Sequence, residues 1–320
     1  MLALVGINIF WAGSSVAAKV ALEYISPMTL AFLRFSVAAV LMYLTSRMFR
    51  VDLRVARSDW PRFWAMGVLG LAFTYVLTYV GMRYTMASHA ALLIATEPVF
   101  IAILSAVFLR ERLRGTRVLA ILVGLAGVYI IVNNGVRPVG VSVRLVGDAL
   151  ITLALVCEAM ASVVGKQLVS RYHPMAVISY EMTIGGLALA PFASWELFGP
   201  LAMSTQHHGV DAHMVSCATL PGGPGHLALT SASAWAVLYL ILPCTVLGYT
   251  VWYTLLEGRD AGEMSVSLYI QPAVGALLGW YFLGDHITAY TLGGGALVFV
   301  ALFVLTMSRA RTGPIPPATD

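Results

Sequence analysis

The stretch AGSSVAAKVALEYISPM, residues 12–28, returns 147 positions later as AMASVVGKQLVSRYHPM, residues 159–175. Five identities hold these two stretches in register: Ala12 with Ala159, Ser15 with Ser162, Lys19 with Lys166, Pro27 with Pro174, and Met28 with Met175. A shift of 174 positions gives a second set: Tyr75 with Tyr249, Tyr79 with Tyr253, Ala87 with Ala261, Pro98 with Pro272, and Leu109 with Leu283. Identity at a fixed offset indicates a chain made of two copies of one unit. The larger second offset places an insertion in the second copy, in residues 199–233.

Each copy consists mainly of apolar blocks about 20 residues long, the length that an α-helix needs to cross roughly 30 Å of hydrocarbon. Of the 320 residues, 59% are hydrophobic and 11% are charged, whereas soluble domains have about 25% charged residues. The composition therefore predicts an all-α polytopic membrane protein with ten transmembrane helices. The predicted spans are Leu2–Leu22, Met28–Ser46, Phe63–Gly81, Met86–Leu109, Val118–Val132, Val146–Leu168, Met175–Phe198, Ala234–Leu256, Met264–Leu283 and Tyr290–Met307.

Basic residues in the short loops predict the orientation of these helices. With a cytoplasmic N-terminus, 13 of the 19 Lys and Arg residues lie in inner loops and 3 in outer segments, as the positive-inside rule requires. Both termini are then cytoplasmic, and the net charge of +4 reflects topology rather than nucleic-acid binding. Because each copy has five spans, an odd number, the second copy enters the membrane upside down. Two loops of the second copy, residues 199–233 and 284–289, accordingly lack the Lys and Arg residues of their counterparts in the first copy.

The predicted organisation has a first repeat in residues 1–135, a linker in residues 136–146 and a second repeat in residues 147–309, which contains the outer insertion. Residues 310–320 form a cytoplasmic tail. Inverted repeats are typical of secondary transporters, in which one half moves against the other around a site at the middle of the membrane.

Several motifs resemble those of EamA-type members of the drug/metabolite transporter (DMT) superfamily. They are Trp11 with Lys19, Pro27 and Arg34, the run from Ala87 through Glu97-Pro98 to Leu109-Arg110-Glu111, and its partner from Ala261 through Gln271-Pro272 to Leu283-Gly284-Asp285. The resemblance implies a ten-helix fold of two inverted five-helix repeats. It also implies export of amino acids or related metabolites across the inner membrane of a bacterial cell. Arg110 and Asp285 depart from the Gly and Glu that are commoner in the family, and the outer segment after the seventh helix is longer.

Glu97 is the most informative charged residue, because it lies about 16 Å into the predicted fourth span at 1.5 Å per residue. A charge at that depth costs roughly 2.5 to 3.5 kcal/mol, so the carboxyl group should be protonated, paired or in contact with water. Pro98 removes a backbone donor and predicts a kink beside it. Gln271 and Pro272 repeat this arrangement in the ninth span without the charge. A substrate or proton site and a fixed structural pair both remain open for Glu97.

Arg34 lies about 10 Å into the second helix at 1.5 Å per residue and is the natural partner of Glu97 or of a substrate carboxylate. The 147-residue shift pairs it with Glu181. Together with Glu158, these residues would line a polar path through an apolar bundle, for ion pairing or for proton transfer. The alternative is a set of salt bridges that only tie helices together.

Aromatic residues supply candidate walls for a binding pocket. Trp11 lies midway along the first helix, too deep for an interfacial belt. Two pairs at i, i+4 spacing, Tyr75 with Tyr79 and Tyr249 with Tyr253, each share one helix face. Ordinary helix packing with satisfied hydroxyl groups is the alternative for each of them.

The remaining polar groups give weaker predictions. Lys19 and Lys166 either extend to the headgroups or place an ammonium group at each mouth of a cavity. Gly275 and Gly279 form a GxxxG step that allows close packing, including a homodimer. The histidines near Cys217 in residues 199–233 fit no zinc spacing, so no metal and no cofactor are predicted.

The leading hypothesis is thus a carrier of a small-molecule substrate in the lipid bilayer, with no nucleic-acid partner and no enzymatic activity. One alternative is an intramembrane enzyme acting on a lipid-soluble substrate, but no nucleophile elbow and no HExxH motif occurs. Another is a DMT-type carrier of a drug, sugar or nucleotide derivative. A channel would need rings of like charge, whereas the embedded residues mix signs.

Overall fold

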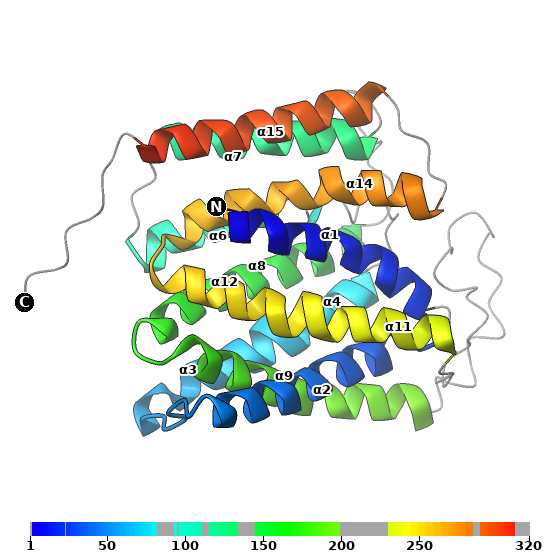
Figure 1. Cartoon of the computed structure of the whole chain (residues 1–320), viewed down its shortest axis with the longest axis vertical. Coiled ribbons are helices and arrows are strands. Elements are labelled where there is room, and N and C mark those ends of the chain that lie inside the picture. Colours follow the sequence, from blue (N-terminus) through cyan, green and yellow to red (C-terminus); the bar gives the residue numbers. More distant parts are fainter. Residues whose placement is uncertain are drawn as a thin grey trace, which may run out of the picture.

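The computed structural model describes residues 2–22, 24–81, 93–94, 96–110, 115–133, 145–198, 230–283 and 289–310. These residues form a bundle of helices that run roughly parallel or antiparallel to one another (Figure 1). Within them, five helices are long and apolar enough to cross a membrane: Leu2–Leu22, Pro27–Met48, Ala149–Val169, Pro174–Phe198 and Ser231–Glu257. The uninterrupted helices are α1 (Leu2–Leu22), α2 (Pro27–Met48), α7 (Gly115–Asn133), α8 (Leu145–Val169), α9 (Pro174–Phe198) and α15 (Ala289–Ala310). The helical fold class predicted from the apolar blocks is therefore confirmed.

The third helix of each repeat contains a π-helical segment, which the sequence did not predict. In the first repeat, a 3-10 turn η1 (Arg57–Asp59) leads into α3 (Trp60–Trp64), the π-helix η2 (Ala65–Phe73) and α4 (Thr74–Gly81). In the second, α11 (Ser231–Tyr239) continues as the π-helix η3 (Leu240–Leu247) and α12 (Gly248–Glu257). The 174-residue shift superimposes these two π-segments almost residue for residue. Such π-segments are rare and frequently mark functional sites.

The fourth helix of each repeat is interrupted next to its proline. Within the predicted span Met86–Leu109, the described part has a turn at Thr96 directly before α6 (Glu97–Phe108), next to the kink predicted at Pro98. Glu97 is therefore the first residue of a helix, and Pro98 lies in its first turn, where its missing N–H group costs nothing. In the second repeat, α13 (Ala261–Ser265) passes through a 3-10 turn η4 (Val266–Tyr269) into α14 (Ile270–Leu283). Residues 82–92 and 95 lie outside the described part.

Packing between the two repeats is reciprocal. Helices α2 and α9 lie side by side and form one flank of the bundle, and helices α7 and α15 form the opposite flank (Figure 1). Between them, η2 packs on α8 and α9, while η3 packs on α1 and α2. Helix α14 packs on α1, and α6 packs on α8. Each contact therefore has a counterpart in which the roles of the two repeats are exchanged.

The core lies between the repeats, and large apolar side chains cover the outside. Phe35, Phe63 and Tyr269 are fully buried, whereas Leu187 and Phe299 are more than half exposed. Small residues allow the close crossings: a Cβ atom added to Gly70 of η2 would lie 2.2 Å from the Cβ atom of Ala161 on α8. Exposed apolar side chains around a tightly packed centre are what a lipid-embedded bundle requires.

Candidate functional site

A tract of polar and aromatic side chains crosses the region where the two repeats meet. The first repeat contributes α1, α2, α4 and α6, and the second contributes α8, α9 and α12 together with the π-helix η3. Most of the side chains predicted for the binding site lie in this tract: Trp11, Arg34, Tyr75, Glu97, Glu158, Glu181, Tyr249 and Tyr253. The side chains of Tyr79, Lys19 and Pro272 lie outside the described part, so those predictions stay predictions.

Arg34 is the buried cation of this tract, with an exposed fraction of 9%. Its Nε atom donates a hydrogen bond to Oγ1 of Thr245, over 2.7 Å. The guanidinium carbon lies 5.0 Å from the ring centre of Phe35 and 5.8 Å from that of Tyr75. A planar guanidinium group held on one edge and stacked on rings has a fixed orientation.

Three carboxyl groups share the tract with this single described cation. Glu158 occupies the middle, since it interacts electrostatically with Arg34, with Glu97 and with Glu181. The carboxyl group on which Arg34 acts is that of Glu158. Glu97 interacts with Glu158 instead, so its pairing with Arg34 stays a prediction. Glu97 and Glu158 are partly accessible to solvent.

Glu181 differs from the other two because it is almost fully buried, with an exposed fraction of 3%. Its Oε1 atom accepts a hydrogen bond from the hydroxyl group of Tyr253, over 3.3 Å. Its Oε2 atom is buried and has no hydrogen-bond partner among the described residues. A buried polar atom without a partner is costly and needs an explanation.

The aromatic residues form a connected wall beside these charges. Trp11 donates a hydrogen bond from Nε1 to the carbonyl oxygen of Cys244 in η3, over 2.7 Å. Its ring meets the ring of Tyr249 edge-on, with 6.0 Å between centres, and Tyr249 lies 6.3 Å from Tyr253. Tyr75 of the first repeat interacts electrostatically with Tyr249 of the second. Trp11, Tyr75, Tyr249 and Tyr253 therefore lie in one region of the structure, and a pocket lined by them stays a prediction.

Gln271 lies in a separate polar chain. Its Nε2 atom donates to Oδ1 of Asn8 over 3.0 Å, and Nδ2 of Asn8 donates to Oγ of Ser267 over 3.1 Å. Asn8 is fully buried. These bonds connect α1 to the interrupted helix of the second repeat at its 3-10 turn. Asn8 was not predicted from the sequence.

Lys166 was predicted at a cavity mouth or at the headgroups, and the structure gives it a local partner. Its ammonium group donates to the carbonyl oxygens of Leu256, over 2.5 Å, and Glu257, over 2.9 Å. These carbonyl groups end helix α12 and have no partner within that helix. A lysine in this position stabilises a helix C-terminus.

A second cluster joins two loops at one end of the bundle. Asp59 accepts hydrogen bonds from Arg171, at 3.1 and 3.2 Å, from the hydroxyl group of Tyr172, at 2.8 Å, and from Arg62. The Tyr172 hydroxyl, followed by Arg171 and Arg62, holds the pKa of Asp59 below its ordinary value, against the opposing effect of its burial. No sequence signal pointed to this cluster, which connects the loop after α2 with the loop after α8.

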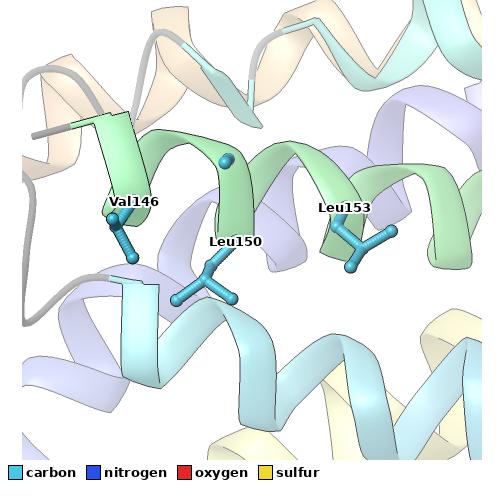
Figure 2. A pocket seen from close by; sticks show the side chains of 4 residues that line it. Val146, Leu150 and Leu153 are labelled. Carbon is cyan, nitrogen blue, oxygen red and sulfur yellow. The ribbon is translucent and has the colours of Figure 1, made fainter.

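A hollow near the start of α8 lies away from this tract. It measures about 320 Å³ and is lined by Val146, Ala149, Leu150 and Leu153 near the start of α8. Three of these side chains follow one side of that helix (Figure 2). The lining is apolar and includes no residue of the predicted site.

Among the described residues, no group of three His, Cys, Asp or Glu side chains could hold a metal ion, and residues 199–229 lie outside that part of the chain.

A bundle of lipid-facing helices around a buried tract of mixed charge defines an α-helical membrane transport protein. The chain belongs to the EamA-like transporter family, which matches residues 1–133 and 145–307. It is therefore a transporter rather than an enzyme, consistent with the DMT superfamily.

Relatives of known sequence agree with this family. An uncharacterized transporter of Archaeoglobus fulgidus is 28% identical over 300 residues, which cover 94% of this chain and 96% of that protein. A probable terminal-alkyne amino-acid exporter of Streptantibioticus cattleyicolor is 27% identical over 318 residues. These residues cover 98% of this chain and 96% of the exporter. A protein of known crystal structure superposes with a TM-score of 0.77 over 98% of both chains, at 18% sequence identity. That likeness shows a shared fold.

Proposed function

We propose that this protein is a secondary carrier that exports amino acids or related zwitterionic metabolites across the inner membrane of a bacterial cell by alternating access. One observation supports this most directly: Arg34 is fixed by Thr245 and lies beside Glu158, next to the aromatic wall of Trp11, Tyr75 and Tyr249.

The chemistry of these groups fits a zwitterion. A guanidinium group binds a carboxylate through parallel hydrogen bonds, and Glu158 is the group that a substrate carboxylate would replace beside Arg34. Glu158 would then accept the substrate ammonium group. The rings of Trp11 and Tyr249 offer an apolar surface to a side chain, with contact at their faces and edges. The exporter of Streptantibioticus cattleyicolor supports an amino-acid substrate.

The arrangement of the helices supports alternating access. We propose ten transmembrane helices in two inverted five-helix repeats, in residues 1–135 and 147–309. Reciprocal packing, with η2 against α8 and α9 and η3 against α1 and α2, is what a two-fold relation between such repeats produces. Exchange of the two packing modes would open the tract first to one side of the membrane and then to the other.

The orientation of the chain is also proposed from two observations. The Asp59 cluster joins two loops that both carry Arg residues, which supports a shared, cytoplasmic side for them. In Figure 1 these loops lie at the same end of the bundle as the start of α1 and the end of α15. Both termini are then cytoplasmic. A homodimer is proposed through the GxxxG step of Gly275 and Gly279 on α14; within the described part of the chain, no atom lies within 4 Å of a Cβ added to Gly275.

Counterflow in proteoliposomes tests the carrier function. Vesicles loaded with one unlabelled amino acid, dipeptide, sugar or nucleotide derivative at a time are diluted into the same labelled compound. We expect saturable accumulation of at least one amino acid, and its loss in Arg34→Gln but not in Arg47→Gln, a matched change at the exposed end of the same helix. Accumulation of sugars or nucleotide derivatives alone would refute the substrate class, and no accumulation of any compound would refute the carrier.

A further inference from the structure

The site contains more negative than positive charge. Glu97, Glu158 and Glu181 lie in one electrostatically connected group, and Arg34 is the cation that acts on it within the described tract. Ionisation of all three carboxyl groups would leave a net charge of two units in the middle of an apolar bundle. Such a charge costs several kcal/mol unless it is neutralised. A substrate ammonium group and protons are the available sources of positive charge.

The repeat shows which half of the site carries which charge. The 147-residue shift that aligns the repeats pairs Trp11 with Glu158 and Arg34 with Glu181. At equivalent positions of one scaffold, the first repeat therefore supplies a cation and an indole ring, and the second supplies two carboxyl groups. Glu158 is the member of that pair on which Arg34 acts. Glu181 is the member left with one weak hydrogen bond, at 3.3 Å.

The surroundings of Glu181 fit a proton better than a substrate. The helices packed against α9 are α2, α3, η2, α8 and α12. The titratable groups on the described parts of these elements are Arg34, Tyr43, Arg47, Arg62, Cys157, Glu158, Lys166, Tyr249, Tyr253 and Glu257. Arg62 contacts Asp59, Lys166 bonds the end of α12, and Arg34 bonds η3. The groups that act on Glu181 are Tyr253, Tyr249 and Glu158, none of which is cationic.

We infer that Glu181 is the proton-carrying residue of this transporter and that it couples the export of one substrate molecule to the uptake of one proton. The buried Oε2 atom, which has no partner, is where the proton binds. Protonation turns the carboxylate into a neutral acid, and deprotonation returns the proton to water on the other side of the membrane. No electron transfer and no covalent bond to the protein is involved. This inference rests on the proposed carrier function.

Tyr253 links that proton to the rest of the site. The Tyr253 hydroxyl group donates a hydrogen bond to the ionised Glu181 and can accept one from the protonated form. The direction of this hydrogen bond therefore depends on whether Glu181 carries the proton. Its ring lies against the backbone of α8, because a Cβ atom on Gly165 would be 2.5 Å from the ring carbon Cε1. A change at Glu181 is thereby passed to the helix that carries Glu158.

Infrared difference spectroscopy of the purified protein tests proton binding without any substrate. We expect a pH-dependent carboxylic-acid C=O band in the wild type that is absent in Glu181→Gln. It is retained in Glu196→Gln, the matched change on the same helix, whose side chain bonds Thr29 instead. Tyr253→Phe should keep the band and move it to higher frequency, because the acid loses its hydrogen bond. A band that survives in Glu181→Gln would overturn the inference, whatever the transport data show.

Transport then tests coupling, with a labelled mixture of the twenty amino acids as the probe. We expect Glu181→Gln to keep counterflow exchange and to lose the accumulation that a pH gradient drives in the wild type. Gradient-driven accumulation in the mutant equal to that of the wild type would overturn the coupling role. Absence of counterflow in the wild type would refute the carrier itself, and the infrared band would still decide whether Glu181 binds the proton.

Discussion

Replacement of Asp59 by asparagine should loosen the contact between the two loops that carry Asp59 and Arg171. Asn keeps the shape of the side chain and one acceptor oxygen but removes the charge. In the wild type this carboxylate accepts bonds from Tyr172 and Arg171, and Arg62 adds a third contact. The Asp59 side chain has little contact with solvent, since the residue is only 2% exposed. Water therefore does not replace the lost contacts.

The expected loss in the free energy of unfolding is about 2 kcal/mol. A hydrogen bond to a charged group contributes about 1.5 to 3 kcal/mol, and the buried bond from Tyr172 falls in this class. The two arginine side chains are 56% and 41% exposed, so each of their ion pairs contributes about 0 to 1 kcal/mol after solvent screening. The retained oxygen of Asn offsets part of the sum. Thermal or denaturant unfolding in detergent micelles measures the difference.

The difference should depend on pH with a definite sign. The pKa of Asp59 is lower in the folded protein than its ordinary value of about 4. The carboxylate therefore stabilises the fold fully above about pH 4 to 5 and progressively less as the pH falls through the lowered pKa. Asp52→Asn, at an exposed position of the same loop, should leave stability unchanged. Equal stability of wild type and Asp59→Asn at pH 7, or a difference that stays constant down to pH 3, would refute the reasoning.

Three further substitutions follow from the packing and the polar contacts. Arg34→Lys keeps the charge but loses the Nε bond and the ring stacking, so the initial rate of counterflow should fall roughly tenfold or more, equivalent to about 1.4 kcal/mol. Gly70→Ala forces a methyl group against Ala161 and should lower the free energy of unfolding by about 1 to 3 kcal/mol, measured by thermal unfolding in detergent. Gly6→Ala is the control, because a Cβ atom there has no described atom within 4 Å, and it should leave the stability unchanged. Lys166→Met removes two bonds to the end of α12 and should cost about 1 to 3 kcal/mol in the same melt; an unchanged melting temperature would contradict the capping role.

Apolar block length predicted the helices well, because hydrocarbon thickness fixes how many residues must be apolar. Block length could not predict the π-segments in the third helices. A span is equally apolar whether its backbone hydrogen bonds join residues four positions apart, as in an α-helix, or five positions apart, as in a π-helix. Pro243 within η3 was a visible signal, but η2 contains no proline. The turn at Thr96 was signalled by Pro98, which was interpreted as a kink in a longer helix. Where a helix breaks depends on the neighbours that satisfy its free backbone groups, and these come from distant parts of the chain.

Depth along a helix predicted the members of the polar tract better than their partners. Arg34 and Glu97 lie at depths that suggested a pair, but depth does not give the rotation of a helix about its axis, so Glu158 was not identified as a partner of Arg34. Thr245 was missed because a threonine in an apolar span commonly bonds its own backbone. It does so here, donating to the carbonyl oxygen of Leu240 over 2.8 Å, and its oxygen still accepts from Arg34.

A symmetric scaffold that carries an asymmetric site has a mechanistic consequence. In the proposed alternating-access cycle, rocking would exchange the packing of the two repeats, so the path to water would change sides. The charges do not exchange, because Arg34 belongs to the first repeat and Glu181 to the second in every state. A zwitterion held by Arg34 therefore keeps one orientation through the whole cycle, while the side of the membrane that can reach Glu181 alternates. Protons and substrate then meet the same two groups from opposite sides, which is the condition for exchange of one against the other.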